Sequence, residues 1–275
     1  KSRGLGDVYK RQAKGFEENG HEAIVLAANH WDEYKELNPD DIAFFLCPQG
    51  WRPQEKLPRP VIALFGDHPI YHLGRIKPLL NEDCVLCLPY PNFIHFTSKF
   101  LPQLKTRLVP PSAASKGPIS FEDKNIDVIA MGSLVGEERT KLHPQVPDWL
   151  KKLAKKTINR LKEGDIGAIT TLYQQAQAQF KTKAPHVNAD TREQFIAHTA
   201  ITADLYWRRQ LRITYLQALS HLPITVYGEG WDQVITNHKG GIQFRPPLPY
   251  QKALEAYQSA KMVLTLYPAG YSNQE

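Results

Sequence analysis

The sequence predicts an α/β protein with two domains, each built around a parallel sheet. Short buried apolar runs alternate with helical stretches along the chain, which is typical of doubly wound parallel sheets. A stretch rich in Pro, Ser, Ala and Gly interrupts this alternation and indicates a linker between domains. The length of 275 residues also favours two domains over one.

Residues 1–12, KSRGLGDVYKRQ, are not expected to belong to the fold. They carry four cations and two glycines without a periodic apolar face. A back-translation of Ser2–Gln12 resembles a transposon adapter used to fragment DNA for sequencing, so we expect an adapter-derived segment, with a genuine basic tail as the alternative. We therefore expect the first strand of the first domain to be missing before Ala13, and closing elements to be missing after Glu275.

The first domain is predicted over residues 13–112. The stretch AKGFEENG is expected to form a helix that stops at Asn19 and Gly20, because this pair ends helices, and a strand is expected over residues 21–27. Further strands are expected within four apolar runs, at residues 39–51, 59–69, 83–89 and 106–112.

The linker is predicted at residues 113–124 and the second domain at residues 125–275. IDVIAMGSLVGEER indicates a strand, a glycine-containing turn and a helix. A polar stretch with helical period, at about residues 147–222, is expected to be a helical insertion. Later elements are expected as strands within 224–231 and 262–268, separated by a helix at 250–260.

Charge and hydropathy give little support to nucleic-acid or membrane functions. The chain carries 34 Lys and Arg against 28 Asp and Glu, a net charge of +6, and without residues 1–12 the net charge is +3. Nucleic-acid binding calls for a more concentrated basic stripe. No apolar run approaches the length of a membrane span and no secretory signal is visible, so we expect a cytoplasmic protein.

Three cysteines, Cys47, Cys84 and Cys87, are expected to be reduced thiols. Cys84 and Cys87 form a C-x-x-C pair, but no second pair or histidine cluster completes a zinc set. We expect them to pack within strands, with redox and metal roles as alternatives. No metal site is predicted.

Two glycine-containing turns in the second domain are candidate ligand sites. Gly132 and Ser133 are expected where a strand turns into a helix, so that backbone N–H groups, the helix dipole and Arg139 would face an anion. The alternative is an ordinary tight turn. In VYGEGW, Gly228 and Gly230 would let the backbone approach a ligand at the carboxyl end of a strand. In this motif Trp231 could instead be a core aromatic, and Glu229 a solvated charge.

Two further candidates follow predicted strands. In LFGDHPIYH, Asp67 and His68 could position or deprotonate a hydroxyl, whereas the alternative is a surface turn. In the last stretch, YPAGYSNQE, the side chains of Tyr271, Ser272 and Asn273 are hydrogen-bonding groups that follow a buried strand.

YGEGW, followed by FRPPLPYQKALEAYQSAKMVLTLYPAGYSNQE, resembles the C-terminal domain of the spore-maturation (CgeB-like) glycosyltransferase family. GHEAIVL, VIALFGDHP and IDVIAMGSLVGEER are similar to earlier parts of such proteins. The resemblance covers most of the chain except residues 147–206 and is most specific after Ile224. It implies two Rossmann-like domains of the GT-B class, the second with a helical insertion. The family pattern usually continues with an Arg and an acidic residue in the next helix, and these contacts are absent from the sequence up to Glu275.

The resemblance implies transfer of a sugar from a nucleotide-sugar donor, UDP- or GDP-linked, to an acceptor hydroxyl, without a protein-bound metal or other cofactor. Asp67 would be the base, with His68 beside it. The donor would contact residues of the second domain: Gly132, Ser133, Arg139, Tyr227, Gly228, Glu229, Trp231, Tyr250, Tyr271, Ser272 and Asn273. We expect the chain as it stands to be inactive.

Two alternatives come from other classes. A GT-B scaffold could hold a glycan or nucleotide without chemistry. The helical insertion could bind nucleic acid through a cluster of cations, although lysines at such spacings usually form a solvated helix face. These cations are Lys151, Lys152, Lys155, Lys156, Arg160 and Lys162.

Overall fold

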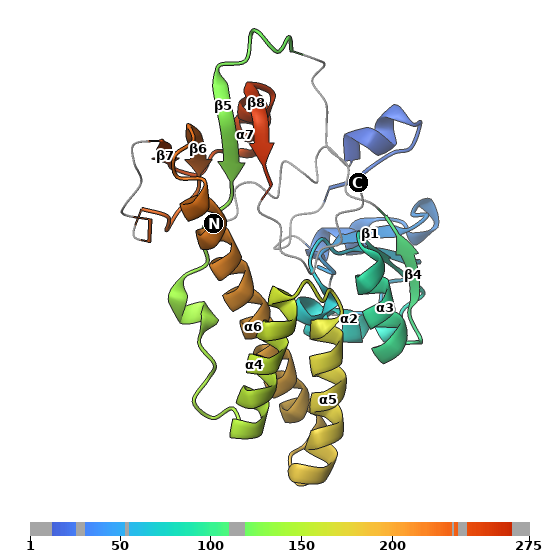
Figure 1. The fold of residues 1–275 in the computed structure, drawn as a ribbon. Coiled ribbons are helices and arrows are strands. Elements are labelled where there is room, and N and C mark those ends of the chain that lie inside the picture. Colours follow the sequence, from blue (N-terminus) through green and yellow to red (C-terminus); the bar gives the residue numbers. More distant parts are fainter. Residues whose placement is uncertain are drawn as a thin grey trace. The chain divides into compact units, whose positions relative to one another are not determined.

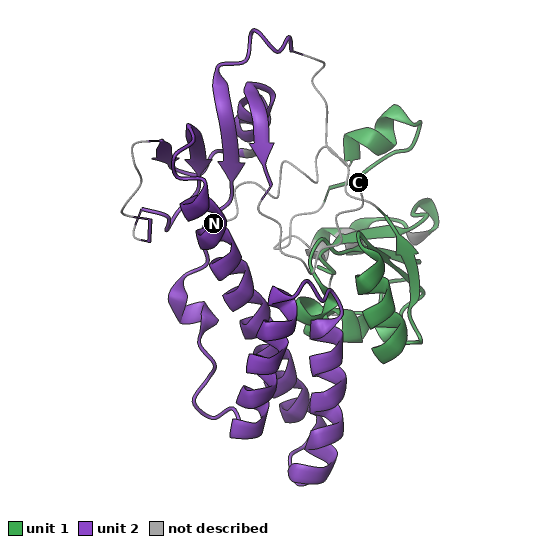
Figure 2. Ribbon diagram, in the orientation of Figure 1, with its two compact units in different colours: residues 1–113 green, residues 114–275 purple. Residues whose placement is uncertain are grey.

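The computed structural model describes residues 13–25, 31–52, 55–109, 119–232, 234–235 and 241–265. The protein is α/β, with two four-stranded parallel sheets (Figure 1). Each sheet lies in its own compact unit, residues 1–113 and 114–275 (Figure 2). No helix in the described part of the chain is both long and apolar enough to cross a bilayer.

The first unit is a sheet whose strands lie side by side in chain order. These strands are β1 (Phe45–Pro48), β2 (Val61–Leu64), β3 (Cys84–Leu88) and β4 (Lys105–Leu108), all parallel. Buried and half-buried residues alternate along β1 and β2, because successive side chains of a strand point to opposite faces. The first three predicted apolar runs therefore each contain a strand, and the fourth overlaps β4 at residues 106–108.

Short helices connect these strands. They are η1 (Trp31–Glu36), η2 (Pro39–Asp41), η3 (Pro69–His72), α2 (Leu73–Ile76), η4 (Lys77–Asn81) and α3 (Pro91–Phe100). Pro91 opens α3, where its missing N–H costs nothing and its fixed φ suits a helix. Phe93 and Phe96 of α3 are completely buried and anchor this helix in the core of the first unit.

The beginning of the described chain confirms one prediction and corrects another. Residues 13–18 are helical and the helix stops at Asn19 and Gly20, where Gly20 has φ 82°. Residues 21–25 are not a strand, so the prediction is wrong there, and residues 26 and 27 lie outside the described residues. Ile24 and Val25 remain 58% and 46% exposed, since no described strand pairs with them.

The second unit has the strand order β7-β6-β5-β8. Its strands are β5 (Ile126–Met131), β6 (Ile224–Tyr227), β7 (Ile242–Arg245) and β8 (Ala260–Leu264). The chain builds outward from β5 through β6 to β7 and then crosses to the other side of β5. The order reverses at β5, and open α/β sheets bind ligands beside the carboxyl ends of strands at such a point.

The edge strand β7 was not predicted from the sequence. Ile242 is its one buried residue, and the polar Gln243 and Arg245 alternate with it and with Phe244. A four-residue strand with this pattern carries too little apolar signal to be recognised by itself.

The stretch predicted as a helical insertion is helical, with α4 (Asp148–Lys162), α5 (Ala168–Lys183) and α6 (Ala189–Ala218). The three helices pack against one another, and Figure 1 shows α6 continuing from this bundle to the sheet. The end of α6 belongs to the core of the sheet, where Leu216 is completely buried beside Ile224 and Val226. The helix that connects β5 to β6 is therefore continuous with the added bundle.

The opposite face of the second sheet is covered by α7 (Tyr250–Gln258), which connects β7 to β8. Ala256 of α7 packs with Ile129 and Ala260 in a small core cluster of its own. Helices thus lie on both faces of this sheet, which leaves the carboxyl ends of its strands as the place where loops gather.

Candidate functional site

The loops that follow β5 and β6 are joined by hydrogen bonds at the carboxyl ends of these strands. The backbone N–H of Gly132 donates to the oxygen of Tyr227 at 2.9 Å, and that of Leu134 donates to the oxygen of Glu229 at 2.8 Å. The N–H of Glu229 donates to Oγ of Ser133 at 3.1 Å. Two sequence-predicted motifs, GS and YGEGW, therefore form one structural unit.

Gly228 is a glycine because the two loops approach each other closely. Its φ is 152°, and a Cβ at this position would lie 2.4 Å from the carbonyl oxygen of Gly132. The sequence predicted a close approach of backbone to a ligand here, whereas the group that comes close is the neighbouring loop.

Trp231 connects this pair of loops to the hydrophobic core of the second unit. It is 1% exposed, belongs to the core cluster under the sheet, and donates from Nε1 to the oxygen of Gly132 at 2.8 Å. The structure thus selects the alternative reading of Trp231 as a core aromatic, since a side chain buried to this degree offers no surface to a nucleotide.

A cation that the sequence analysis missed lies at the same place. Nη1 of Arg212, on α6, donates to the carbonyl oxygen of Ser133 at 3.0 Å, and its guanidinium would lie 3.8 Å from a Cβ on Gly132. Residues four apart share a helix face, so the buried Leu216 could have indicated that Arg212 points toward the carboxyl edge of the sheet.

The helix N-terminus predicted at Gly132 is not there. Residues 132–136 lie outside helices and strands, and the next element, η5 (Glu137–Thr140), is a single turn. The Lys141 ammonium donates to Glu137 and lowers the pKa of that carboxyl, which keeps negative charge at the start of η5. Arg139 is exposed on η5. The predicted anion site therefore has an acidic single turn where the N-terminus of a helix was expected.

The remaining predicted donor residues are placed as follows. Tyr227 is half-buried against the cluster of α7, whereas the side chain of Glu229 is exposed. Tyr250 begins α7, and Tyr271, Ser272 and Asn273 lie outside the described residues.

In the first unit, the two predicted catalytic residues differ in exposure. His68 is 7% exposed, accepts at Nδ1 from the N–H of Ile70 at 3.2 Å, and packs edge-on against Phe93 and Phe96. It caps η3 rather than facing open solvent. Asp67 has an exposed side chain, and its Oδ2 lies 3.8 Å from Nε2 of His72.

The three cysteines are buried on β1 and β3, which confirms their expected packing role. Burial raises the pKa of Cys47 to about 12 and that of Cys84 to about 11, and it also raises the pKa of Cys87. A thiol that stays protonated is a weak nucleophile and a poor metal ligand. Among the described residues, no group of three His, Cys, Asp or Glu side chains could hold a metal ion.

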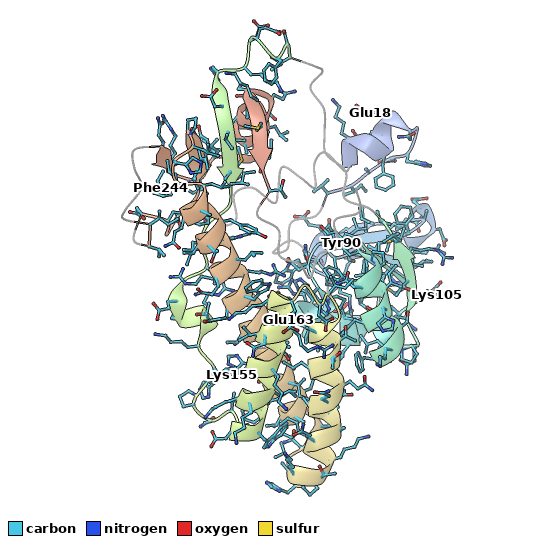
Figure 3. All side chains as sticks on the ribbon, in the orientation of Figure 1. Glu18, Tyr90, Lys105, Lys155, Glu163 and Phe244 are labelled. Atoms are coloured by element: carbon cyan, nitrogen blue, oxygen red, sulfur yellow. The ribbon has the colours of Figure 1, made fainter. Side chains whose placement is uncertain are left out.

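The predicted basic cluster lies along α4. Lys155 is one of its exposed members and can be found in Figure 3. Two other members have acidic partners, since Lys151 contacts Asp148 at 3.0 Å and Arg160 is paired with Asp165. The arrangement is that of a solvated helix face with mixed charge.

Comparison with known proteins adds no assignment to this geometry. No family model, no curated protein and no solved structure matches this chain.

Proposed function

We propose that this protein is a glycosyltransferase that moves a sugar from a nucleotide-sugar donor to an acceptor hydroxyl. The order β7-β6-β5-β8 corresponds to the 3-2-1-4 part of the Rossmann strand order, in which nucleotides bind beside the reversal. This correspondence supports the second unit as a Rossmann-like donor domain, and the four parallel strands of the first unit suit an acceptor domain of the GT-B class.

The observation that carries the proposal is the guanidinium of Arg212 beside Gly132 and Ser133 at the reversal. A departing nucleoside diphosphate carries negative charge that increases in the transition state. An arginine fork donates charge-assisted hydrogen bonds to such oxygens, and the hydroxyl of the exposed Ser133 is a second donor. In this proposal Arg212 therefore takes the role that the sequence analysis gave to Arg139.

The chemistry requires one bond to form and one to break. The acceptor oxygen bonds to the anomeric carbon of the sugar, and the bond between that carbon and the donor phosphate oxygen breaks. The electron pair leaves with the diphosphate, and the hydroxyl proton passes to a base, for which Asp67 is the proposed residue. Its exposed carboxylate suits this role better than the buried ring of His68.

The test is calorimetric titration of UDP and GDP into the wild-type protein and two arginine variants. Arg212→Ala removes a charged hydrogen bond worth about 1.5–3 kcal/mol, so nucleotide affinity should fall about ten- to a hundredfold. Arg139→Ala is the matched control and should bind as the wild type does, because Arg139 is exposed on η5. Arg212→Lys, which keeps the charge, should recover part of the affinity.

The same series separates an enzyme from a binding module. Asp67→Ala should leave nucleotide binding unchanged. Sugar transfer is measured with the complete enzyme, in which Asp67→Ala should sharply reduce it, whereas a binding module transfers no sugar even as the complete wild type. If neither UDP nor GDP binds, or if Arg139→Ala weakens binding while Arg212→Ala does not, the proposal is wrong.

A further inference from the structure

A second group of polar side chains gathers at the carboxyl ends of β1 and β2, within the first unit. Gln49 directly follows β1, and Asp67 follows β2 after two residues. The strands run parallel with Pro48 beside Leu64, so these ends meet at one edge of the sheet. A Cβ on Gly66 would lie 3.4 Å from Nε2 of Gln49, which places the amide against the residue before Asp67.

The backbone of Gln49 is held in a conformation that few residues other than glycine adopt. Its φ is 54°, in the left-handed region. Its N–H donates to the oxygen of Leu64, and its own carbonyl accepts from Nη1 of Arg75 at 3.3 Å. Strained backbone of this kind costs stability and concentrates at functional sites, where it aims a side chain.

Two polar atoms of this group are buried without a hydrogen-bond partner among the described residues. They are Oε1 of Gln49 and Nε2 of His72. The side chain of His72 is 13% exposed, its ring packs against Phe65, and the 3.8 Å to Oδ2 of Asp67 is too long for a hydrogen bond. Buried polar atoms of folded proteins are almost always paired with protein, water or a ligand.

An exposed aromatic lies on the same side of the unit. Trp51 follows β1 by three residues and is 48% exposed, and the guanidinium of Arg75 stacks on its ring at 3.9 Å. Arg75 thus touches both Trp51 and the strained Gln49. Aromatic surface beside a few convergent polar atoms is the composition of a small-molecule site.

We propose that the carboxyl ends of β1 and β2 bind a neutral polyhydroxyl ligand, a sugar, through Gln49 and His72. A hydroxyl both donates and accepts, so it can satisfy the amide oxygen of Gln49 and the ring nitrogen of His72 in either tautomer. An anion is disfavoured, because Asp67 is a carboxylate and the guanidinium of Arg75 is engaged by the ring of Trp51 and the carbonyl of Gln49. The apolar face of a sugar ring can pack on the exposed part of Trp51.

This inference names the acceptor class of the proposed function and rests on that function for the reaction, but not for the binding. It also makes His72, whose Nε2 lies 3.8 Å from Oδ2 of Asp67, the histidine that binds the acceptor beside the proposed base. A hydroxyl bound to Nε2 of His72 would lie close to the carboxylate of Asp67, because Oδ2 of Asp67 is 3.8 Å from that nitrogen.

The test is saturation-transfer NMR with the whole protein and a panel of neutral sugars, without nucleotide. The panel contains the methyl glycosides of glucose, galactose, mannose and N-acetylglucosamine, together with maltose and cellobiose. Inorganic phosphate, followed by its effect on sugar binding, is the anionic probe. At least one sugar should receive saturation from the protein, and phosphate should not displace it.

Two variants remove the unpartnered atoms while sparing the fold. Gln49→Gly deletes the amide and suits φ 54°, so the variant should be at least as stable as the wild type. His72→Phe keeps a ring against Phe65 and deletes the nitrogen. Each should weaken sugar affinity at least tenfold, and the exposed His95→Phe on α3 is the matched control that should not.

The inference is overturned if no sugar of the panel binds, if phosphate displaces the sugar, or if both variants bind as the wild type does. Its failure can be told from failure of the proposed function by titrating UDP and GDP into the same proteins. If the wild-type protein binds UDP or GDP but no sugar of the panel, this inference alone is overturned. If the wild-type protein binds a sugar of the panel but neither UDP nor GDP, the proposed function alone is overturned.

Discussion

At the scale of single residues, Gly228 sets how closely the loops after β5 and β6 approach each other. Three contacts at the candidate donor site depend on this approach: the bonds from Gly132 to Tyr227, from Leu134 to Glu229 and from Glu229 to Ser133. A side chain at Gly228 would separate the loops and remove Gly132 from the guanidinium of Arg212.

We expect Gly228→Ala to destabilise the second unit. The new Cβ would lie 2.4 Å from the oxygen of Gly132, and φ 152° is unfavourable for alanine. The free energy of unfolding should fall by at least about 1–3 kcal/mol in urea denaturation. Gly74→Ala in α2, where a Cβ meets nothing within 4 Å, should be neutral or slightly stabilising. Equal stability of the two variants would contradict this account.

At the scale of elements, α6 has two tasks. Its first part packs with α4 and α5, and its last turns form the crossover between β5 and β6. A contact in the first third of the helix fixes the chain that follows η5. Nε2 of His198 accepts from the N–H of His143 at 3.1 Å, and Nδ1 of His143 accepts from the N–H of Gln145 at 3.3 Å.

This contact predicts a loss of stability in mild acid. Burial, and then the neighbouring His143, lower the pKa of His198 below its usual value. The unfolded chain therefore binds a proton more readily, so stability is complete above about pH 6.5 and falls as the pH drops through the lower folded pKa. His198→Gln keeps an acceptor but does not titrate, so its unfolding free energy should fall less between pH 8 and 5.

The control for this experiment is His95→Gln, at an exposed position of α3. Its stability should follow the same pH curve as the wild type. The assignment to His198 is wrong if both variants, measured by urea denaturation at each pH, follow the wild-type curve.

At the scale of the whole molecule, each compact unit has its own sheet and its own core. Units with separate cores commonly unfold as separate cooperative steps. The long helical bundle belongs to the second unit, because α6 is continuous from the bundle into the core of the second sheet.

We therefore expect matched core substitutions to affect different unfolding steps. Leu86 on β3 and Leu216 on α6 are both completely buried, and Leu→Ala at such sites costs about 2–5 kcal/mol. In calorimetry, Leu86→Ala should lower the transition of the first unit and Leu216→Ala that of the second. A single transition lowered equally by both variants would show that the units unfold together.

Much of the fold was predictable because strands buried in a parallel sheet appear as short apolar runs. The runs around Cys47, Ala63 and Leu86 each contain a strand, and burial of the cysteines followed from their position in these runs. The predicted strand at residues 21–25 failed because its apolar residues lack a described partner strand, and pairing is not a local property.

The sequence by itself determined the α/β class, the parallel strands and the helical stretch between β5 and β6. Short apolar runs and helical periodicity are patterns of neighbouring residues, so they can be recognised without the tertiary structure. Only the tertiary structure decided which side chains meet. Arg212 reaches Ser133 across 79 residues, and Trp231 reaches Gly132 across 99. It likewise brought Nε2 of His72 within 3.8 Å of Oδ2 of Asp67 and buried the ring of His68. Such contacts depend on strand order and on where helices cross the sheet. A local sequence pattern predicts neither of these.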